Sequence, residues 1–320
     1  MTAQLVVIVG PTGAGKSELA IELAHRCNGE VLSADSQQVY RGMDIGTGKV
    51  TTTQRRGVTH HLIDILDPDQ EMTAAMFQSR ADKVIADAKA RGVPIVVAGG
   101  TMLYLRALLR GLFSGPSKDD ALRERLTQEA SSQPNGTRSL WQRLESIDPI
   151  SAQKIDPADL RRIIRALEVF ELTGEPLSVH HQRHNFKSLR YSVYRVGLAP
   201  PREQLYMQIN NRVDQMMAQG LLEEVKQLRN AGYTATLRSQ RAIGYAELHH
   251  HLDHGTELSQ AVALIKRNSR RYARRQLSWY RQDNSITWHQ TTDLVDLAKL
   301  MSFLSIASST SSQSTSSQPT

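Results

Sequence analysis

The chain has 320 residues and a formal net charge of +7, a basic balance that favours a polyanionic partner. Its single cysteine, Cys27, excludes a disulfide framework and a zinc finger, and suits a reducing cytosol. No apolar run is long enough to span a bilayer and no secretory signal is evident, so we expect a soluble, cytoplasmic protein with one large domain or a domain plus an insertion.

The first predicted element is a buried strand at residues 5–9, an apolar and β-branched run. An amphipathic helix follows from residue 17, and the eight residues between fit G-x-x-x-x-G-K-S/T. In this strand–loop–helix context the backbone amides should converge on a phosphate, Lys16 should reach the outer phosphate, and the Ser17 hydroxyl should hold Mg²⁺. A glycine-rich turn that binds nothing is the alternative. The predicted loop comprises Gly10, Pro11, Thr12, Gly13, Ala14, Gly15, Lys16 and Ser17.

A second strand is predicted at residues 30–34, and Asp35 follows at its carboxyl end. In an open parallel sheet, ligands bind at this edge, so Asp35 should face the phosphate loop if the two strands are neighbours. There it could coordinate Mg²⁺ through water or act as a general base. The alternative is a turn former or helix cap.

The next elements continue an α/β pattern, which predicts a P-loop NTPase-like parallel sheet core. They are strands at 60–66 and 92–98, and helices at 74–91 and 102–109. No strand ends in the apolar-run-then-Asp pattern of a Walker B motif, which argues against an ATP-hydrolysing motor.

Composition changes near residue 116, where helices at 119–130, 137–146 and 159–173 predict a mostly helical insertion over 116–188. A strand at 191–198 resumes the core, two helices separated at Gly220 follow, and Arg241 is a candidate for bracing a diphosphate or for a surface salt bridge. The predicted parts are therefore 1–115 (first part of the core), 116–188, 189–302 (continuation of the core) and 303–320 (a disordered Ser/Thr-rich tail).

Residues 258–282 predict a basic helix without any Asp or Glu. Arginines at i, i+3 and i+4 spacing place like charges along one side, an arrangement that favours nucleic acid over a merely solvated face. The histidine tracts at 180–184 and 249–254 are interpreted as exposed surface rather than metal sites.

With these pieces placed, residues 1–290 resemble the bacterial tRNA dimethylallyltransferase (tRNA isopentenyltransferase) family. The ordered set of motifs is specific, although the phosphate loop alone is not. Besides that loop, the motifs are DSQQVY (35–40), DIGT (44–47), HHLID (60–64), GGTMLY (99–104), RIIRALEV (162–169), AIGY (242–245) and RQLSW (275–279).

The resemblance implies transfer of a dimethylallyl group from dimethylallyl diphosphate to N6 of the adenine at tRNA position 37, with Mg²⁺ as cofactor. The adenine would flip out of the anticodon stem-loop, with Asp35 as its general base. Lys16, Ser17, Thr12 and Arg241 would act on the diphosphate. The implied tRNA-binding residues are Asp35, Ser36, Gln37, Gln38, Thr101, Arg123, Arg161, Arg162, Ile163, Ile164, Arg165, Arg267, Arg271 and Arg274.

Some positions depart from the family pattern. Gly48 and Val50 stand where Ala and Pro are common, Arg161 where Gln is usual, and Ala246 where a basic residue is common. Three alternatives remain: an adenylate isopentenyltransferase with free AMP, ADP or ATP as acceptor, a small-molecule kinase, and an RNA-binding module with a vestigial nucleotide site. Nothing in the sequence demands more than a monomer.

Overall fold

The computed structural model describes residues 3–309 of the chain, and the side chains of 3–305. The described part divides into two compact units, one formed by residues up to 109 and from 189 onward, the other by residues 110–188. No helix in the described part of the chain is both long and apolar enough to cross a membrane.

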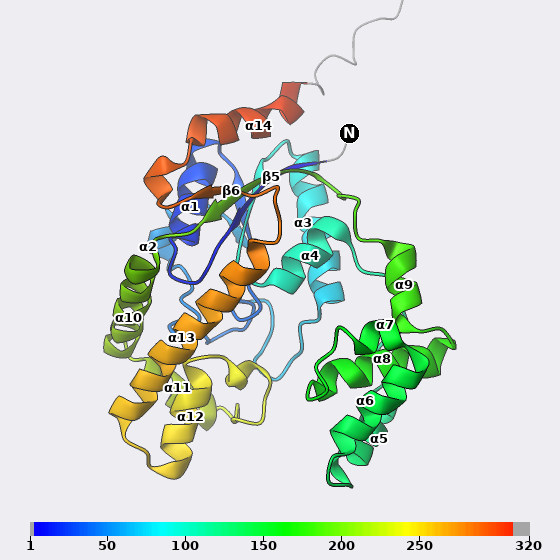
Figure 1. Cartoon of the computed structure of the whole chain (residues 1–320). Helices are drawn as coiled ribbons and strands as arrows, with labels where there is room; N and C mark the ends of the chain where they lie inside the picture. The colour runs from blue at the N-terminus through cyan, green and yellow to red at the C-terminus, as the bar shows by residue number, and fades with distance from the viewer. Residues whose placement is uncertain (1–2, 310–320) are drawn as a thin grey trace, which may run out of the picture. The chain divides into compact units, whose positions relative to one another are not determined.

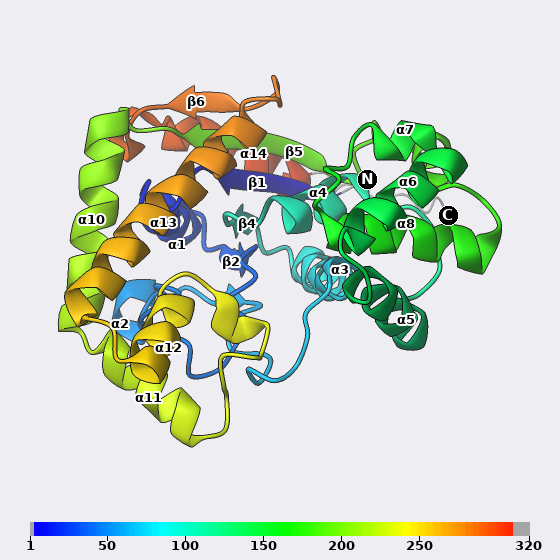
Figure 2. The same cartoon turned by 60° about the horizontal axis from the view of Figure 1, so that its bottom comes forward.

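The first unit is built on a six-stranded parallel sheet in the order β3-β2-β4-β1-β5-β6. Figure 2 shows the succession from β2 to β6. This confirms the predicted α/β class with a parallel sheet. The strands are β1 (Gln4–Val9), β2 (Glu30–Ser33), β3 (His60–His61), β4 (Ile95–Ala98), β5 (Ser192–Leu198) and β6 (Thr287–His289).

The two faces of the sheet are covered by different helices because β1 and β4 are apolar on both sides. Val6 and Ile8 pack with α1 and α14, whereas Leu5 and Val7 pack in a larger core with α3, α4 and the helices α11 to α13. The helices of this unit are α1 (Lys16–Arg26), α2 (Thr52–Arg55), α3 (Ala74–Ala90), α4 (Met102–Arg110), α10 (Arg202–Ala218), α11 (Leu221–Asn230), α12 (Tyr245–His254), α13 (Leu258–Tyr280) and α14 (Leu297–Ser309), with short 3₁₀ turns η1 (Ser239–Arg241) and η2 (Thr292–Leu294).

The second unit is helical and has its own apolar core, to which Leu126, Leu140, Leu144 and Leu167 contribute fully buried side chains. Its helices are α5 (Asp120–Ser131), α6 (Gly136–Ile147), α7 (Pro149–Ala152), α8 (Leu160–Thr173) and α9 (Leu177–His184). The helical insertion expected at 116–188 falls within the 110–188 unit.

Two expectations about the bounds of elements are corrected here. The strand expected over 60–66 is only two residues long, because Leu62 and Asp64 adopt positive φ angles that end the extended backbone. The disordered tail expected over 303–320 is wrong for its first residues, since α14 runs to Ser309 and buries Leu304 against α1; residues 310–320 lie outside the described part.

The histidine tracts are not uniformly exposed. His180 and His249 are buried, and His249 contacts the side chains of Gln240 and Arg229.

Candidate functional site: an anion-binding cavity at the carboxyl end of the sheet

The phosphate-loop motif connects β1 to α1 at the carboxyl edge of the sheet. Gly10 (φ +145°) passes so close to β5 that an added Cβ would lie 2.5 Å from the carbonyl oxygen of Leu198. Gly13 and Gly15 also have positive φ angles. Only glycine suits these positions, and the resulting turn leaves the first amides of α1 without helical acceptors, as an anion site requires.

The loop lines one wall of a cavity of about 1520 Å³. This is larger than a single small ligand needs, so there is room for two reacting groups. The other walls come from residues 35–38 after β2, the loop at 44–51, Gly99 and Gly100 after β4, Arg212 of α10, Arg241 to Gly244, and the inner side of α13.

Lys16 is the loop's cation, and its Nζ donates a 2.7 Å hydrogen bond to the carbonyl oxygen of Pro11. Its pKa is lowered to about 8, mainly by burial and then by the nearby positive charge of Arg212, while the Asp35 carboxylate opposes the shift. Lys16 is therefore mostly charged at neutral pH but titrates only slightly above it, and an anion in the cavity would raise its pKa again.

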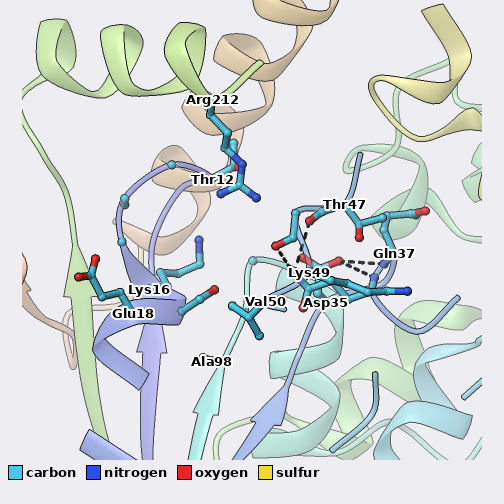
Figure 3. A pocket seen from close by; sticks show the side chains of 18 of the residues that line it. Thr12, Lys16, Glu18, Asp35, Gln37, Thr47, Lys49, Val50, Ala98 and Arg212 are labelled. Carbon is cyan, nitrogen blue, oxygen red and sulfur yellow. Dashed lines mark hydrogen bonds between the residues drawn. The ribbon is translucent and has the colours of Figure 1, made fainter. Parts of the chain in front are cut away.

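Arg212 is a second cation of the cavity, which the sequence analysis missed. Its guanidinium points into the cavity opposite Lys16 (Figure 3), and burial lowers its pKa while Asp35 raises it. Helical spacing could have indicated that Arg212 faces inward, because it lies about one turn after Ile209 and next to Val213, both of which are buried residues of α10.

Arg241, which the sequence offered for the diphosphate, also lines the cavity but is exposed. Its Nη2 donates to the carbonyl oxygen of Thr236 at 3.2 Å. Among the cavity arginines, Arg212 is the one whose charge acts on Lys16. The geometry therefore favours Arg212 over Arg241 as the arginine beside a bound anion.

Asp35 faces this cationic pair across the cavity, although β4 lies between β1 and β2 and the two strands are not neighbours. Its Oδ1 accepts hydrogen bonds from the amides of Gln37 (2.8 Å) and Gln38 (3.4 Å), as a turn former does. Oδ2 has no hydrogen-bond partner within the described residues. Asp35 therefore stabilises its own turn through Oδ1 and keeps Oδ2 available to a ligand.

The neighbours of Asp35 have structural partners of their own. Thr101 Oγ1 accepts from the Ser36 amide (2.9 Å), and the Gln38 side chain bonds to Ser33 Oγ and to the carbonyl oxygens of Thr47 and Gly48. The Gln37 side chain lines the cavity (Figure 3), and its buried Oε1 has no partner in the described part of the chain.

The Ser17 hydroxyl lines the cavity and fits a Mg²⁺ ligand. The described residues hold no group of three or more His, Cys, Asp or Glu side chains that could cage a metal ion. Mg²⁺ does not need such a cage, because it usually binds one or two protein oxygens, substrate phosphates and water.

The predicted basic helix is confirmed as α13, and its basic residues fall into an exposed group and a group bonded to α10. Arg267, Arg271 and Arg274 are exposed and form no ion pair within the described residues. Lys266 instead pairs with Asp214 of α10 (2.6 Å), and Arg270 bonds to Asn210 Oδ1 (2.5 Å). The helix α10 lies beside α13 (Figures 1 and 2). Its acidic and polar side chains therefore neutralise or bind some of the basic residues of α13, although α13 itself contains no Asp or Glu.

The residues of the helical unit that were expected to bind tRNA include both buried and exposed side chains. The side chains of Ile163 and Ile164 are buried in the core of this unit, where they pack against its other helices. Arg123 and Arg165 both pair with the fully buried Glu168. Burial opposes the charge of Glu168, but hydrogen bonds from these two arginines outweigh it and lower its pKa to about 2. Arg161 and Arg162 are the exposed members of the set.

Fold and site together define a P-loop α/β protein whose phosphate loop lines a cavity with two cations, Lys16 and Arg212, on one side and the carboxylate of Asp35 opposite them. A family model described as IPP transferase matches residues 38–283. The chain is 48% identical over 285 residues to a tRNA dimethylallyltransferase of Geobacter metallireducens, covering 89% of this chain and 92% of that protein. A tRNA dimethylallyltransferase of Carboxydothermus hydrogenoformans is 46% identical over 289 residues, covering 90% and 92%.

Two solved structures are similar over nearly the whole chain. The tRNA isopentenylpyrophosphate transferase of Bacillus halodurans has a TM-score of 0.68 and 40% identity, covering 97% of this chain and 98% of that one. A eukaryotic dimethylallyltransferase described as acting on tRNA has a TM-score of 0.77 and 28% identity, covering 96% and 78%. The chain belongs to the IPP transferase family of tRNA dimethylallyltransferases.

Proposed function

We propose that this chain transfers the dimethylallyl group of dimethylallyl diphosphate to N6 of the adenine at tRNA position 37, with diphosphate as the second product. The observation that carries this proposal is the cavity itself. Lys16 and Arg212 face Asp35 in a space large enough for a diphosphate ester and a base together.

The diphosphate would lie in the loop from Gly10 to Ser17. There the amides at the start of α1, the Lys16 ammonium and the Arg212 guanidinium would stabilise the negative charge that grows on the leaving group as the C–O bond breaks. Mg²⁺, held by the Ser17 hydroxyl, would neutralise part of the same charge. Thr12 Oγ1 is a further polar group of this wall.

Asp35 would accept the proton that N6 loses as the new C–N bond forms, through the oxygen that makes no internal hydrogen bond. The unpartnered Oε1 of Gln37 would accept a hydrogen bond from a bound base. A base must leave its stack to enter a cavity of this kind, so we include base flipping in the proposal.

The exposed arginines of α13 (Arg267, Arg271 and Arg274) would hold the RNA backbone of the anticodon stem-loop, and Arg161 and Arg162 of the helical unit would add to this contact. Ser36 and Thr101, which bond to each other, would support the base site rather than read the base. Nothing in the proposed reaction requires more than a monomer.

The deciding experiment offers labelled dimethylallyl diphosphate and Mg²⁺ to the protein with undermodified tRNA and AMP in parallel. Label in tRNA, located at adenine 37, is the expected result. Label in AMP would instead identify an adenylate isopentenyltransferase, and phosphate transfer from ATP without any prenylation would identify a kinase.

Asp35→Asn tests the proposed base. Turnover should fall about 10²- to 10⁴-fold because the amide cannot accept the proton, while tRNA affinity stays within about twofold. Wild-type turnover in this variant would remove Asp35 from the role of base.

A further inference from the structure

Gln276 lies on the inner side of α13 and makes two hydrogen bonds to distant parts of the chain. Its Oε1 accepts from the backbone amide of Thr12 at 2.9 Å, and its Nε2 donates to the carbonyl oxygen of Gly100 at 2.9 Å. The side chain is 2% exposed, and both of its polar atoms are used. One residue thus bonds to the phosphate loop and to the segment that follows β4.

The side-chain amide of Gln276 occupies space that is free only because residue 100 is a glycine. A Cβ added at Gly100 would lie 2.3 Å from Nε2, a distance that no side chain can occupy without displacing the amide. The Thr12 amide precedes the loop amides proposed to bind the diphosphate, and Gln276 is its acceptor. The Thr12 amide is partly buried, so the loss of its acceptor would cost part of the amide's desolvation free energy and loosen the loop at this residue.

The position of Gln276 on α13 adds a second link. Tyr272, one turn earlier, lines the cavity, and burial together with the Asp35 carboxylate raises its pKa to about 12. Arg271 and Arg274, in the same two turns, are exposed to solvent. The same stretch of helix therefore holds the phosphate loop with its inner side and presents cations with its outer side.

We propose that Gln276 is a positioning residue that fixes the phosphate loop to α13 and to the end of β4, so that the diphosphate site and the proposed tRNA surface keep one geometry. The proposal rests on the proposed function for the identity of the two substrates. Gln276 has no part in the bond-making step itself; it acts through the Thr12 amide.

The first test is Gln276→Met, which keeps the length of the side chain and removes both hydrogen bonds. The affinity for inorganic diphosphate, measured by calorimetry, should fall about tenfold because the loop loses its anchor. Transfer measured as kcat/KM for dimethylallyl diphosphate should fall about 10- to 100-fold, while tRNA affinity changes less than about twofold. Unchanged diphosphate affinity and transfer would overturn the proposal.

The second test leaves Gln276 in place. Gly100→Ala should displace its amide and lower diphosphate affinity by a similar factor. In a Gln276→Ala background, Gly100→Ala should cost nothing further, because the group it displaces is gone. Independent, multiplying losses would overturn the proposal, since Gly100 would then act without Gln276.

These outcomes are distinguishable from failure of the proposed function. Diphosphate affinity needs no transfer, so the two-residue cycle decides the role of Gln276 even if the wild-type protein leaves tRNA unlabelled. The thermal unfolding temperature of each variant is measured as well, so that affinities are compared only between proteins that are folded at the assay temperature. If Gln276→Met is unfolded at the assay temperature, the Gly100→Ala variant keeps the proposal falsifiable, because unchanged diphosphate affinity in this variant would overturn it.

Discussion

Two sets of cations in this molecule lie in different surroundings. Lys16 and Arg212 lie in the walls of the cavity, where burial lowers both of their pKa values. Arg267, Arg271 and Arg274 stand exposed along α13. Charges removed from water interact strongly because they are little screened, whereas the interactions of exposed charges are weakened by water and salt. The cavity is therefore suited to stabilising one developing charge, and the helix to holding a long polyanion.

Among the changes to these two sets of cations, the largest effect is expected from Arg212→Ala. Transfer should fall about 10²- to 10³-fold, as when one preorganised donor to a developing charge is removed, with tRNA affinity unchanged. The matched control is Arg241→Ala, which removes the exposed arginine of the same cavity and should cost less than about tenfold. If Arg241→Ala costs as much as Arg212→Ala, the sequence interpretation of Arg241 is right and the structural one is wrong.

The pH dependence of diphosphate affinity tests the buried set of cations through the titration of Lys16. The pKa of about 8 means that Lys16 is charged below pH 8 and neutral above it. Diphosphate binds the charged form, so above pH 8 binding must be accompanied by proton uptake and affinity should fall about tenfold per pH unit. Lys16→Arg keeps its charge and should flatten the profile relative to the wild type. Parallel profiles in the two proteins would exclude Lys16 as the titrating group.

A smaller effect is expected from the exposed set. Arg271→Gln with Arg274→Gln should weaken tRNA binding about tenfold at low salt and reduce the slope of log K against log salt by about 2, with kcat unchanged at saturating tRNA. Lys266→Gln is the control, because its charge is already balanced by Asp214. A salt slope that stays the same in the double variant would make this side of α13 an ordinary solvated face.

Much of this arrangement could be predicted because local signals and motifs agreed. The loop from Gly10 to Ser17 specifies its strand, turn and helix by itself, and the apolar runs that became β2, β4 and β5 are long enough to recognise. The strand expected over 60–66 failed because no pattern reveals a positive φ at Leu62. The final helix was overlooked among serines, although Leu297, Leu300 and Leu304 have helical spacing.

Side-chain partners were harder to predict because they come from distant segments. Arg212 belongs to no motif that was singled out, and only the fold brings it opposite Lys16. Gln276 was visible in RQLSW, yet its bond to the Thr12 amide spans 264 positions. Likewise, nothing local to Arg123 announces Glu168, 45 residues away, as its partner. Sequence spacing indicates that charges are present, and the fold decides which of them are neutralised.

The smallest effect on transfer is expected from Glu168→Gln in the helical unit, where a third set of arginines is paired internally. Glu168 accepts from Arg123, Arg165 and the Asp119 amide, so its loss leaves two partly buried cations without their counter-charge. We expect a loss of about 3 kcal/mol in the stability of this unit. Hydrogen exchange should show it as lost protection of α8 amides while α1 amides keep theirs, and transfer should stay within about twofold below the unfolding range.

The same carboxylate predicts how this unit responds to acid. Its pKa is about 2 in the folded protein against an ordinary 4.5, so the stability it contributes is fully present above pH 4.5 and is lost as pH falls toward 2. Glu168→Gln should remove that part of the acid dependence. If the variant instead keeps its stability and binds tRNA more weakly, Glu168 serves to orient Arg123 and Arg165 toward RNA. These arginines would then belong with the exposed set of α13 rather than with the internal framework.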